Sequence, residues 1–275
     1  MPSPSLPPSL SVALPPPPPA GSPRYFALLY TQAQLRPVLG ALLALADEIS
    51  AGGARGLDHS VAHLRLDWWR IEAERYAHGE PQHPWLRALL AQHPASRGLN
   101  LQPLVQAAAV DLATQTLSAQ PGVALPGARL QGAVFELAAS VLRADAGADP
   151  LAPALQRTLG DLGQHTLELE RFAAGAASTL TLPVPSAVAA PAAALEALRR
   201  QARNIDGALQ PWLAPLLVWM VLAAAQARRR ARRPQRKRGS VLDGFADNML
   251  AWNAARRAMR GRFRIDSLRP SLEHR

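Results

Sequence analysis

Apolar residues recur at helical spacing along most of the chain, most clearly in residues 57–79. The large apolar side chains here follow one another at steps of four, three, four and three, which is typical of one face of an α-helix. They are Leu57, Val61, Leu64, Trp68 and Ile71. Trp69 stands next to Trp68, and a tryptophan pair buries a large apolar area. We therefore expect these two rings to nucleate a core or to line an apolar pocket.

The same period predicts helices in the rest of the chain. They cover residues 35–49, 101–118, 130–141, 155–169, 190–204, 210–233 and 241–262. The pairs His83-Pro84 and His93-Pro94 bound a further short helix, because a residue before proline is disfavoured in the α conformation. No segment shows the convincing alternation of apolar and polar residues that is typical of a strand. The sequence thus predicts an all-α bundle of about eight or nine helices.

Proline and length suggest the domain organisation. Residues 1–23 hold ten prolines and no charge, so we expect them to form a disordered arm. Residues 24–265 are long enough for one helical domain with a large core, interrupted by a basic linker at 228–238 and followed by a tail at 266–275. Cysteine is absent, which excludes disulfides and thiolate metal ligands. The arm lacks the pattern of a secretory signal, so we expect a cytoplasmic protein.

The positive charge belongs to the last part of the chain. Residues 228–275 carry 15 Lys or Arg against 4 acids, although the whole chain has a net charge of +10. Just before them, residues 207–227 hold no charge, which fits either a membrane span or a buried helix interrupted by Pro211 and Pro215. The basic run itself suits contact with an anionic surface such as the inner membrane, or a solvated linker. It has no interleaved aromatic residues, so nucleic acid is not an expected partner.

Three polar residues stand at metal-ligand spacing on the helix of residues 57–79. His59, His63 and Asp67 are four residues apart and share a helix face. That spacing can bind zinc, but a stable site needs a further ligand and supporting hydrogen bonds. A polar helix face is the simpler interpretation, and no metal site is predicted here.

Several short segments together resemble the squalene/phytoene synthase family. The segments are residues 24–30, 35–37 and 41–49, then 64–70 followed by His83-Pro84, then Leu159-Gly160, Gln164, Thr166 and Leu182-Pro183, and finally 252–257 and 261–263. Their order and spacing are similar to those of bacterial members over nearly all of residues 24–263. The resemblance implies an all-α, isoprenoid-synthase-like bundle with a central apolar cavity for prenyl chains. The side chains expected to line that cavity are Phe26, Leu45, Trp68, Trp69, Val134 and Phe135.

The acidic motifs that the resemblance implies are missing. Active members join two prenyl diphosphates head to head, using Mg²⁺ held by two aspartate-rich motifs on facing helices. The first motif would follow Glu48-Ile49, where the chain has only Ser, Ala and Gly at residues 50–54. In the second, Leu167 and Arg171 stand where the family has asparagine and aspartate. Other acids near these places are weak candidates for the catalytic role, namely Asp47, Glu48, Asp161 and Glu168, with His165 on the same face as the last two.

Two hypotheses of function therefore remain. The first is a non-catalytic family member, a pseudoenzyme that binds a prenyl or other lipid chain or serves as a scaffold, with no cofactor. The mitochondrial complex I assembly factor of this family departs from the catalytic pattern in the same way. The second is an active prenyl transferase that uses the displaced acids with Mg²⁺. The sequence does not identify a protein partner or an oligomeric state.

Overall fold

The computed structural model describes residues 13–52, 59–118, 129–144, 151–174, 189–232 and 241–265. Within these ranges it contains ten α-helices, one short 3₁₀ helix and no strand, so the predicted all-α class is confirmed. The helices are α1 (Pro23–Leu29), α2 (Arg36–Gly52), α3 (His59–His78), α4 (Pro84–Gln92), α5 (Gln102–Ser118), α6 (Arg129–Ala144), α7 (Pro153–Ala174), α8 (Ala189–Ala202), α9 (Gln210–Arg232) and α10 (Val241–Ala258), with the 3₁₀ helix at Pro94–Gly98.

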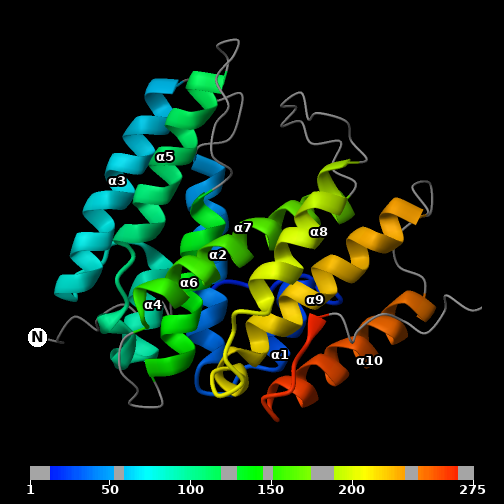
Figure 1. Cartoon of the computed structure of the whole chain (residues 1–275). Coiled ribbons are helices and arrows are strands. Elements are labelled where there is room, and N and C mark those ends of the chain that lie inside the picture. Colours follow the sequence, from blue (N-terminus) through cyan, green and yellow to red (C-terminus); the bar gives the residue numbers. More distant parts are fainter. Residues whose placement is uncertain are drawn as a thin grey trace, which may run out of the picture.

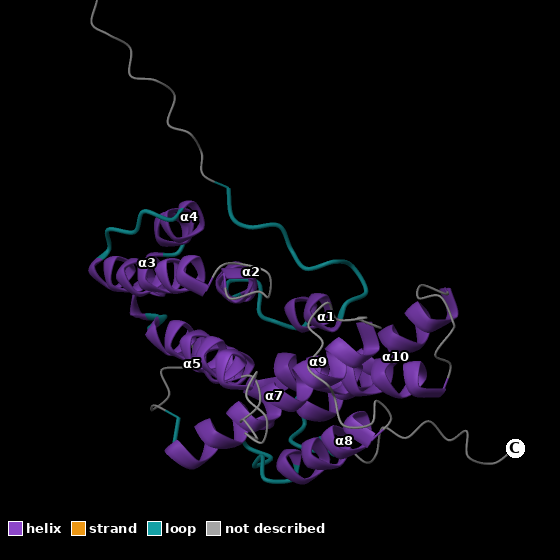
Figure 2. Cartoon of the chain, turned by 90° about the horizontal axis from the view of Figure 1, so that it is seen from above, coloured by secondary structure: helices purple, strands orange, loops and turns teal. Residues whose placement is uncertain are grey.

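The helices pack as a series of neighbours across the molecule (Figure 1). α3 packs on α5, α5 on α6, α6 on α7, α7 on α9, and α9 on α10. α2 lies against α6, and α1 lies against α9, so these two helices cover one side of the series (Figure 2). The basic run 228–238 was expected to be a linker, and its first residues instead continue α9 as far as Arg232.

α9 is the central helix of the bundle. Its residues 213–224 are all buried, because α7, α1 and α10 surround it. α9 is the one described helix that is long and apolar enough to cross a membrane, and 78% of that stretch is buried inside the bundle. A helix that is apolar on every side is expected in the core of a large bundle, which accounts for the uncharged stretch of residues 207–227 without a membrane.

α3 exists where the sequence predicts it, but the expected apolar face is wrong. The described members of that face, Val61, Leu64, Trp68 and Ile71, are exposed. The buried side chains are those of the adjacent stripe, Ala62, Leu66, Trp69, Ala73 and Tyr76. Both stripes have helical spacing, so periodicity alone does not choose between them. The buried one carries two alanines, which let neighbouring helices approach closely, and Tyr76, whose hydroxyl donates to the Ser96 carbonyl at 2.9 Å.

A buried carboxylate connects α3 to the start of α4. Glu72 is fully buried, and its Oε1 accepts hydrogen bonds from the backbone N–H groups of Gln82 and His83, both at 2.7 Å. His83 is the residue before the first turn of α4, with Pro84 at the first helical position. The carboxylate thus satisfies backbone donors that the proline corner leaves without helical partners.

Part of the proline-rich arm packs on the bundle. Of residues 1–23, expected to be disordered, residues 13–19 form a segment without regular secondary structure, residues 20–22 form a turn, and Pro23 begins α1. Leu14 packs against the core, and Ser22 caps α1 by accepting from the backbone N–H of Tyr25 at 3.1 Å. The amide of Gln226 on α9 donates to the Gly21 carbonyl at 3.4 Å. Residues 1–12 and the tail 266–275 lie outside the described residues.

Candidate functional site

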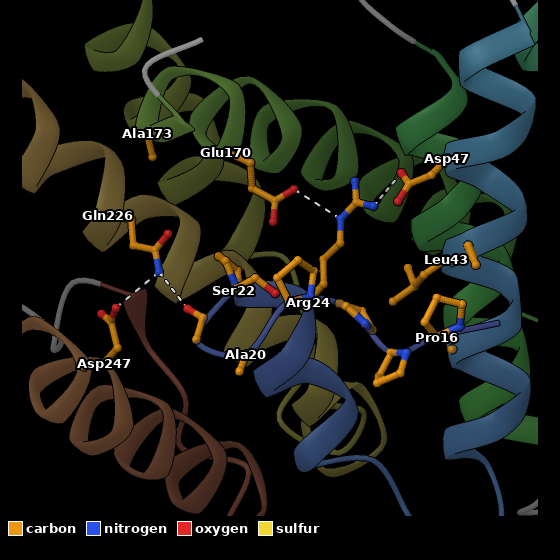
Figure 3. A pocket seen from close by; sticks show the side chains of 18 of the residues that line it. Pro16, Ala20, Ser22, Arg24, Leu43, Asp47, Glu170, Ala173, Gln226 and Asp247 are labelled. Atoms are coloured by element: carbon orange, nitrogen blue, oxygen red, sulfur yellow. Dashed lines mark hydrogen bonds and ion pairs between the residues drawn. The ribbon is translucent and has the colours of Figure 1, made fainter. Parts of the chain in front are cut away.

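A pocket of about 1250 Å³ lies between the proline-rich segment and helices α2, α7, α9 and α10 (Figure 3). Its apolar lining includes Leu43 and Ala44 of α2, Ala173 of α7 and Trp85 of α4, together with residues 16–19 of the arm. Its charged lining consists of Arg24, Asp47, Glu48, Glu170, Arg229, Arg230, Arg232, Asp243 and Asp247. We call it the Arg24 pocket. Its volume exceeds the 300–1000 Å³ or so of typical small-molecule sites.

Arg24 joins two carboxylates that come from opposite walls of the pocket. Its Nη1 lies 2.6 Å from Asp47 Oδ1 on α2, and its Nε lies 3.4 Å from Glu170 Oε2 on α7 (Figure 3). The Arg24 and Glu170 side chains are largely buried, whereas Asp47 is exposed. The guanidinium therefore occupies the space between the two helices on which the sequence resemblance places the acidic motifs.

Glu170 is held by aromatic as well as charged neighbours. The indole Nε1 of Trp219 on α9 donates to Glu170 Oε1 at 2.7 Å, and the Arg24 guanidinium lies 5.2 Å from the centroid of the Trp219 ring. Burial raises the pKa of Glu170, although Arg24 and the Trp219 hydrogen bond act in the opposite direction. Burial by itself would lower the pKa of Arg24, but Glu170 and Asp47 more than offset this, and its pKa is raised. Arg24 is therefore a fixed cation at neutral pH.

The far side of the pocket is a polar contact between α9 and α10. Asp247 of α10 is buried and forms an ion pair with Arg229 and a hydrogen bond with the Gln226 amide at 3.2 Å. Because the same amide donates to the arm, Gln226 ties three segments together at the pocket (Figure 3). Arg230 and Arg232 also line this side and add positive charge next to it.

Three indole rings pack around His83, which contacts Glu48. His83 Nε2 lies 3.3 Å from Glu48, and the His83 ring contacts the rings of Trp68, Trp69 and Trp85 at centroid distances of 6.1, 5.0 and 5.4 Å. His83 is buried, so the imidazole fills the space between the indoles instead of leaving a cavity there. Among these rings, only that of Trp85 lines the Arg24 pocket.

The four candidate acids fall into two separate places. Asp47 and Glu48 line the Arg24 pocket, as their position beside the first motif suggests. Asp161 and Glu168 do not line it: Asp161 accepts from the Gln201 amide of α8 at 3.0 Å, and Glu168 lies 3.4 Å from His165 Nδ1. Thus the four acids do not come together.

The residues expected to line a central apolar cavity do not line this pocket. Phe26, Leu45, Trp69, Val134 and Phe135 are buried members of the hydrophobic core, and Trp68 is on the surface. Phe135 packs on Trp219 at a centroid distance of 4.9 Å. These side chains help to build the bundle and lie outside the pocket lining.

Sequence reasoning missed Arg24 and Glu170, the pair that defines the site. In the sequence, Arg24 is only the first residue of the segment 24–30 that resembles the family. Glu170 stands next to Arg171, and the comparison with the second acidic motif concerns Arg171 alone. The available signal was a charged residue at the start of α1, a helix otherwise rich in apolar residues. Its partners lie 23 and 146 residues away along the chain.

The pocket side chains, as they stand, do not fit a magnesium cluster. Mg²⁺ needs several oxygen ligands, and four of the five carboxylates in the pocket lining already contact another side chain: Asp47 and Glu170 contact Arg24, Asp247 contacts Arg229, and Glu48 lies 3.3 Å from His83 Nε2. Among the described residues, no group of three or more His, Asp or Glu side chains is placed to hold a metal ion. On α3, Asp67 pairs with Arg70 at 3.8 Å, and the side chain of His59 lies outside the described residues, so a zinc site on that helix stays untested.

Comparison with known proteins identifies no relative of this chain. No protein-family model matches the chain, and neither a curated protein nor a solved structure matches it significantly. The similarity to squalene/phytoene synthases stays a prediction from sequence motifs.

Proposed function

We propose that the protein is a non-catalytic relative of the squalene/phytoene synthases that holds a prenyl chain or another lipid chain in the Arg24 pocket. The observation that carries this proposal is the guanidinium of Arg24 between Asp47 and Glu170. A transferase of this family would need divalent cations at such a place to neutralise a leaving diphosphate. In this protein the guanidinium of Arg24 neutralises Asp47 and Glu170 in place of metal ions.

The lining of the pocket supports an amphiphilic ligand. Leu43, Ala44, Trp85 and Ala173 offer apolar contacts for a chain. Arg230 and Arg232 lie on the α9 side and suit an anionic head group, because guanidinium groups bind phosphate oxygens with favourable geometry. Neither part of the lining depends on a metal ion.

The active-transferase hypothesis receives less support. It needs acids that converge on one diphosphate, and Asp161 and Glu168 lie outside the pocket lining. The other two candidates, Asp47 and Glu48, already contact Arg24 and His83. Two further acids of the pocket lining, Glu170 and Asp247, contact Arg24 and Arg229.

The proposal is tested by ligand-induced stabilisation. A ligand that binds only the folded state adds about 2.7 kcal/mol at a hundred times its Kd. We expect geranylgeranyl diphosphate at that ratio to raise the Tm by roughly 5–10 °C, equally in Mg²⁺ and in EDTA. Differential scanning fluorimetry makes this measurement directly.

Two variants give this test its control. Ala44→Trp fills the pocket and should abolish the shift, whereas Ala91→Trp, at an exposed position of α4, should leave it unchanged. A shift that appears only with Mg²⁺, or that survives Ala44→Trp, would contradict binding in this pocket. Absence of any shift would leave the scaffold role as the better hypothesis.

A further inference from the structure

The outer face of α10 carries a stripe of large apolar side chains. Leu242, Phe245, Met249 and Trp252 on α10, and Met259 in the turn directly after it, are between 44% and 75% exposed. At 3.6 residues per turn they fall within an arc of roughly 100° on one side of the helix. We call this set the α10 stripe. Scattered exposed apolar residues are common on protein surfaces, whereas several large ones gathered on one side of a single helix favour an interaction site.

The opposite side of α10 fixes the direction in which the stripe points. Ala251, Ala254, Ala255 and Ala258 are buried, and α9 is the principal neighbour of the helix. Asp247 is buried on the same side, where it bonds to Arg229 and Gln226. α10 lies at the edge of the bundle (Figure 1). The burial of its alanines and the exposure of its large apolar residues show that the small residues face inward and the large ones outward.

The exposed charges around the stripe all have one sign. In residues 241–265, the exposed charged side chains are Arg256, Arg260, Arg262 and Arg264, whereas Asp243 is half-buried and Asp247 is buried. Arg256 also stacks over the Trp252 ring, with its Cζ 5.0 Å from the centroid. Immediately before α10, residues 228–238 supply eight Lys or Arg in the sequence. In the sequence, basic residues therefore both precede and follow the stripe.

We propose that the α10 stripe docks the protein on the surface of an anionic phospholipid bilayer. Large apolar and aromatic side chains on one face, with arginine as the exposed charge, are typical of helices that lie in a membrane interface. The apolar side chains enter the head-group region, and the arginines attract the negative lipid surface. This inference concerns the outer face of α10 and is independent of the Arg24 pocket, which Asp243, Gly244 and Asp247 line from the same helix.

A bilayer fits this surface better than a protein partner does. The positive charge spreads over a long stretch of sequence, from Arg228 to Arg264. No acidic side chain is exposed in residues 241–265, so this surface lacks the mixed pattern of charges that a protein partner would match. An anionic bilayer is negatively charged over its whole surface, so it can attract these arginines without matching their exact positions. For comparison, the exposed stripe on α3 lies among charges of both signs, such as Arg65 and Asp67, and does not match an anionic surface.

Vesicle co-sedimentation of the full chain tests the proposal. We expect binding to vesicles of phosphatidylcholine with 30% phosphatidylglycerol, weak binding to pure phosphatidylcholine, and loss of binding as salt is raised from 0.1 to 1 M, which shortens the Debye length from about 10 to about 3 Å. Leu242→Ser/Phe245→Ser should weaken binding at least about tenfold, because the two large apolar side chains no longer leave water for the lipid. Arg256→Gln/Arg260→Gln should weaken binding to the anionic vesicles alone.

A matched variant and a local probe complete the experiment. Leu64→Ser/Ile71→Ser removes two exposed apolar residues from α3 and should leave vesicle binding unchanged. Brominated lipid should quench part of the tryptophan fluorescence, and Trp252→Phe should remove that quenching. Binding that ignores the α10 variants, or that is lost in the α3 variant instead, would overturn the proposal. So would a dimer in light scattering that Leu242→Ser/Phe245→Ser converts to a monomer, since a second copy would then occupy the stripe.

Discussion

Replacing Arg24 by methionine should lower the free energy of unfolding by about 3–5 kcal/mol, the usual cost of removing one partner of a buried ion pair. Methionine keeps much of the side-chain volume but leaves the Glu170 carboxylate buried next to Trp219 without its cation. Urea denaturation at pH 7 measures this difference. Arg200→Met, at an exposed site on α8, should change the free energy by no more than about 0.5 kcal/mol.

The loss in the Arg24 variant should depend on pH in a defined direction. Burial already raises the pKa of Glu170, and removal of Arg24 takes away its largest opposing influence, so the pKa rises further. The folded variant then takes up a proton more readily than the unfolded chain, and protonation relieves the buried charge. The deficit should therefore shrink as pH falls through the raised pKa of Glu170.

Glu170→Gln supplies the second half of the test. In the Arg24→Met background it removes the unpaired charge while keeping an oxygen that can accept from Trp219, so it should recover part of the lost stability. If the two substitutions instead add without any coupling, Arg24 and Glu170 do not interact energetically and the pocket is not organised around them.

The two neighbouring tryptophans of α3 should respond very differently to alanine. Trp69 is 5% exposed and contacts the rings of Trp68 and His83 at 5.1 and 5.0 Å, so Trp69→Ala should cost about 3–5 kcal/mol. Trp68 is 40% exposed, and its ring lies farther from that of His83, at 6.1 Å, so Trp68→Ala should cost about 1 kcal/mol. Chemical denaturation of both variants measures the difference.

The pair also acts as its own control, because the two substitutions remove the same side chain one residue apart. Equal losses at the two positions would mean that both rings are buried, in contrast to the exposure of Trp68. A larger loss at Trp68 than at Trp69 would contradict the orientation of α3 in the bundle.

Apart from α1, which the apolar period did not predict, the described helices were readable from sequence, but their orientation was not. Apolar period and proline corners located α2, α3, α4 and α9 to within a few residues. The buried side of α3 was not predictable from that period, because two adjacent stripes carry it and only packing against α2 and α5 selects the one with Trp69. Glu72 is a similar case, since a glutamate among other charged residues gives no sign that it is buried.

The site was predictable only on one wall. Asp47 and Glu48 were candidates because they stand next to the place of the missing first acidic motif, and both line the pocket. On α7 the motif comparison pointed to Arg171 and to Asp161 and Glu168, whereas the side chain that faces Arg24 is Glu170. One residue along a helix changes the direction by about 100°, so a small error in alignment moves the candidate to another face. The arginine that joins the walls comes from α1, which no acidic motif identifies.

Diphosphate release is the most direct test of the proposal that the protein is non-catalytic. Purified protein is incubated with farnesyl or geranylgeranyl diphosphate and Mg²⁺, and released diphosphate, squalene and phytoene are measured. With Arg24 held between Asp47 and Glu170, we expect none of these products above the level without protein. Mg²⁺-dependent release that Asp47→Asn or Glu48→Gln abolishes would show that the pocket acids ionise the substrate, and the non-catalytic account would be wrong.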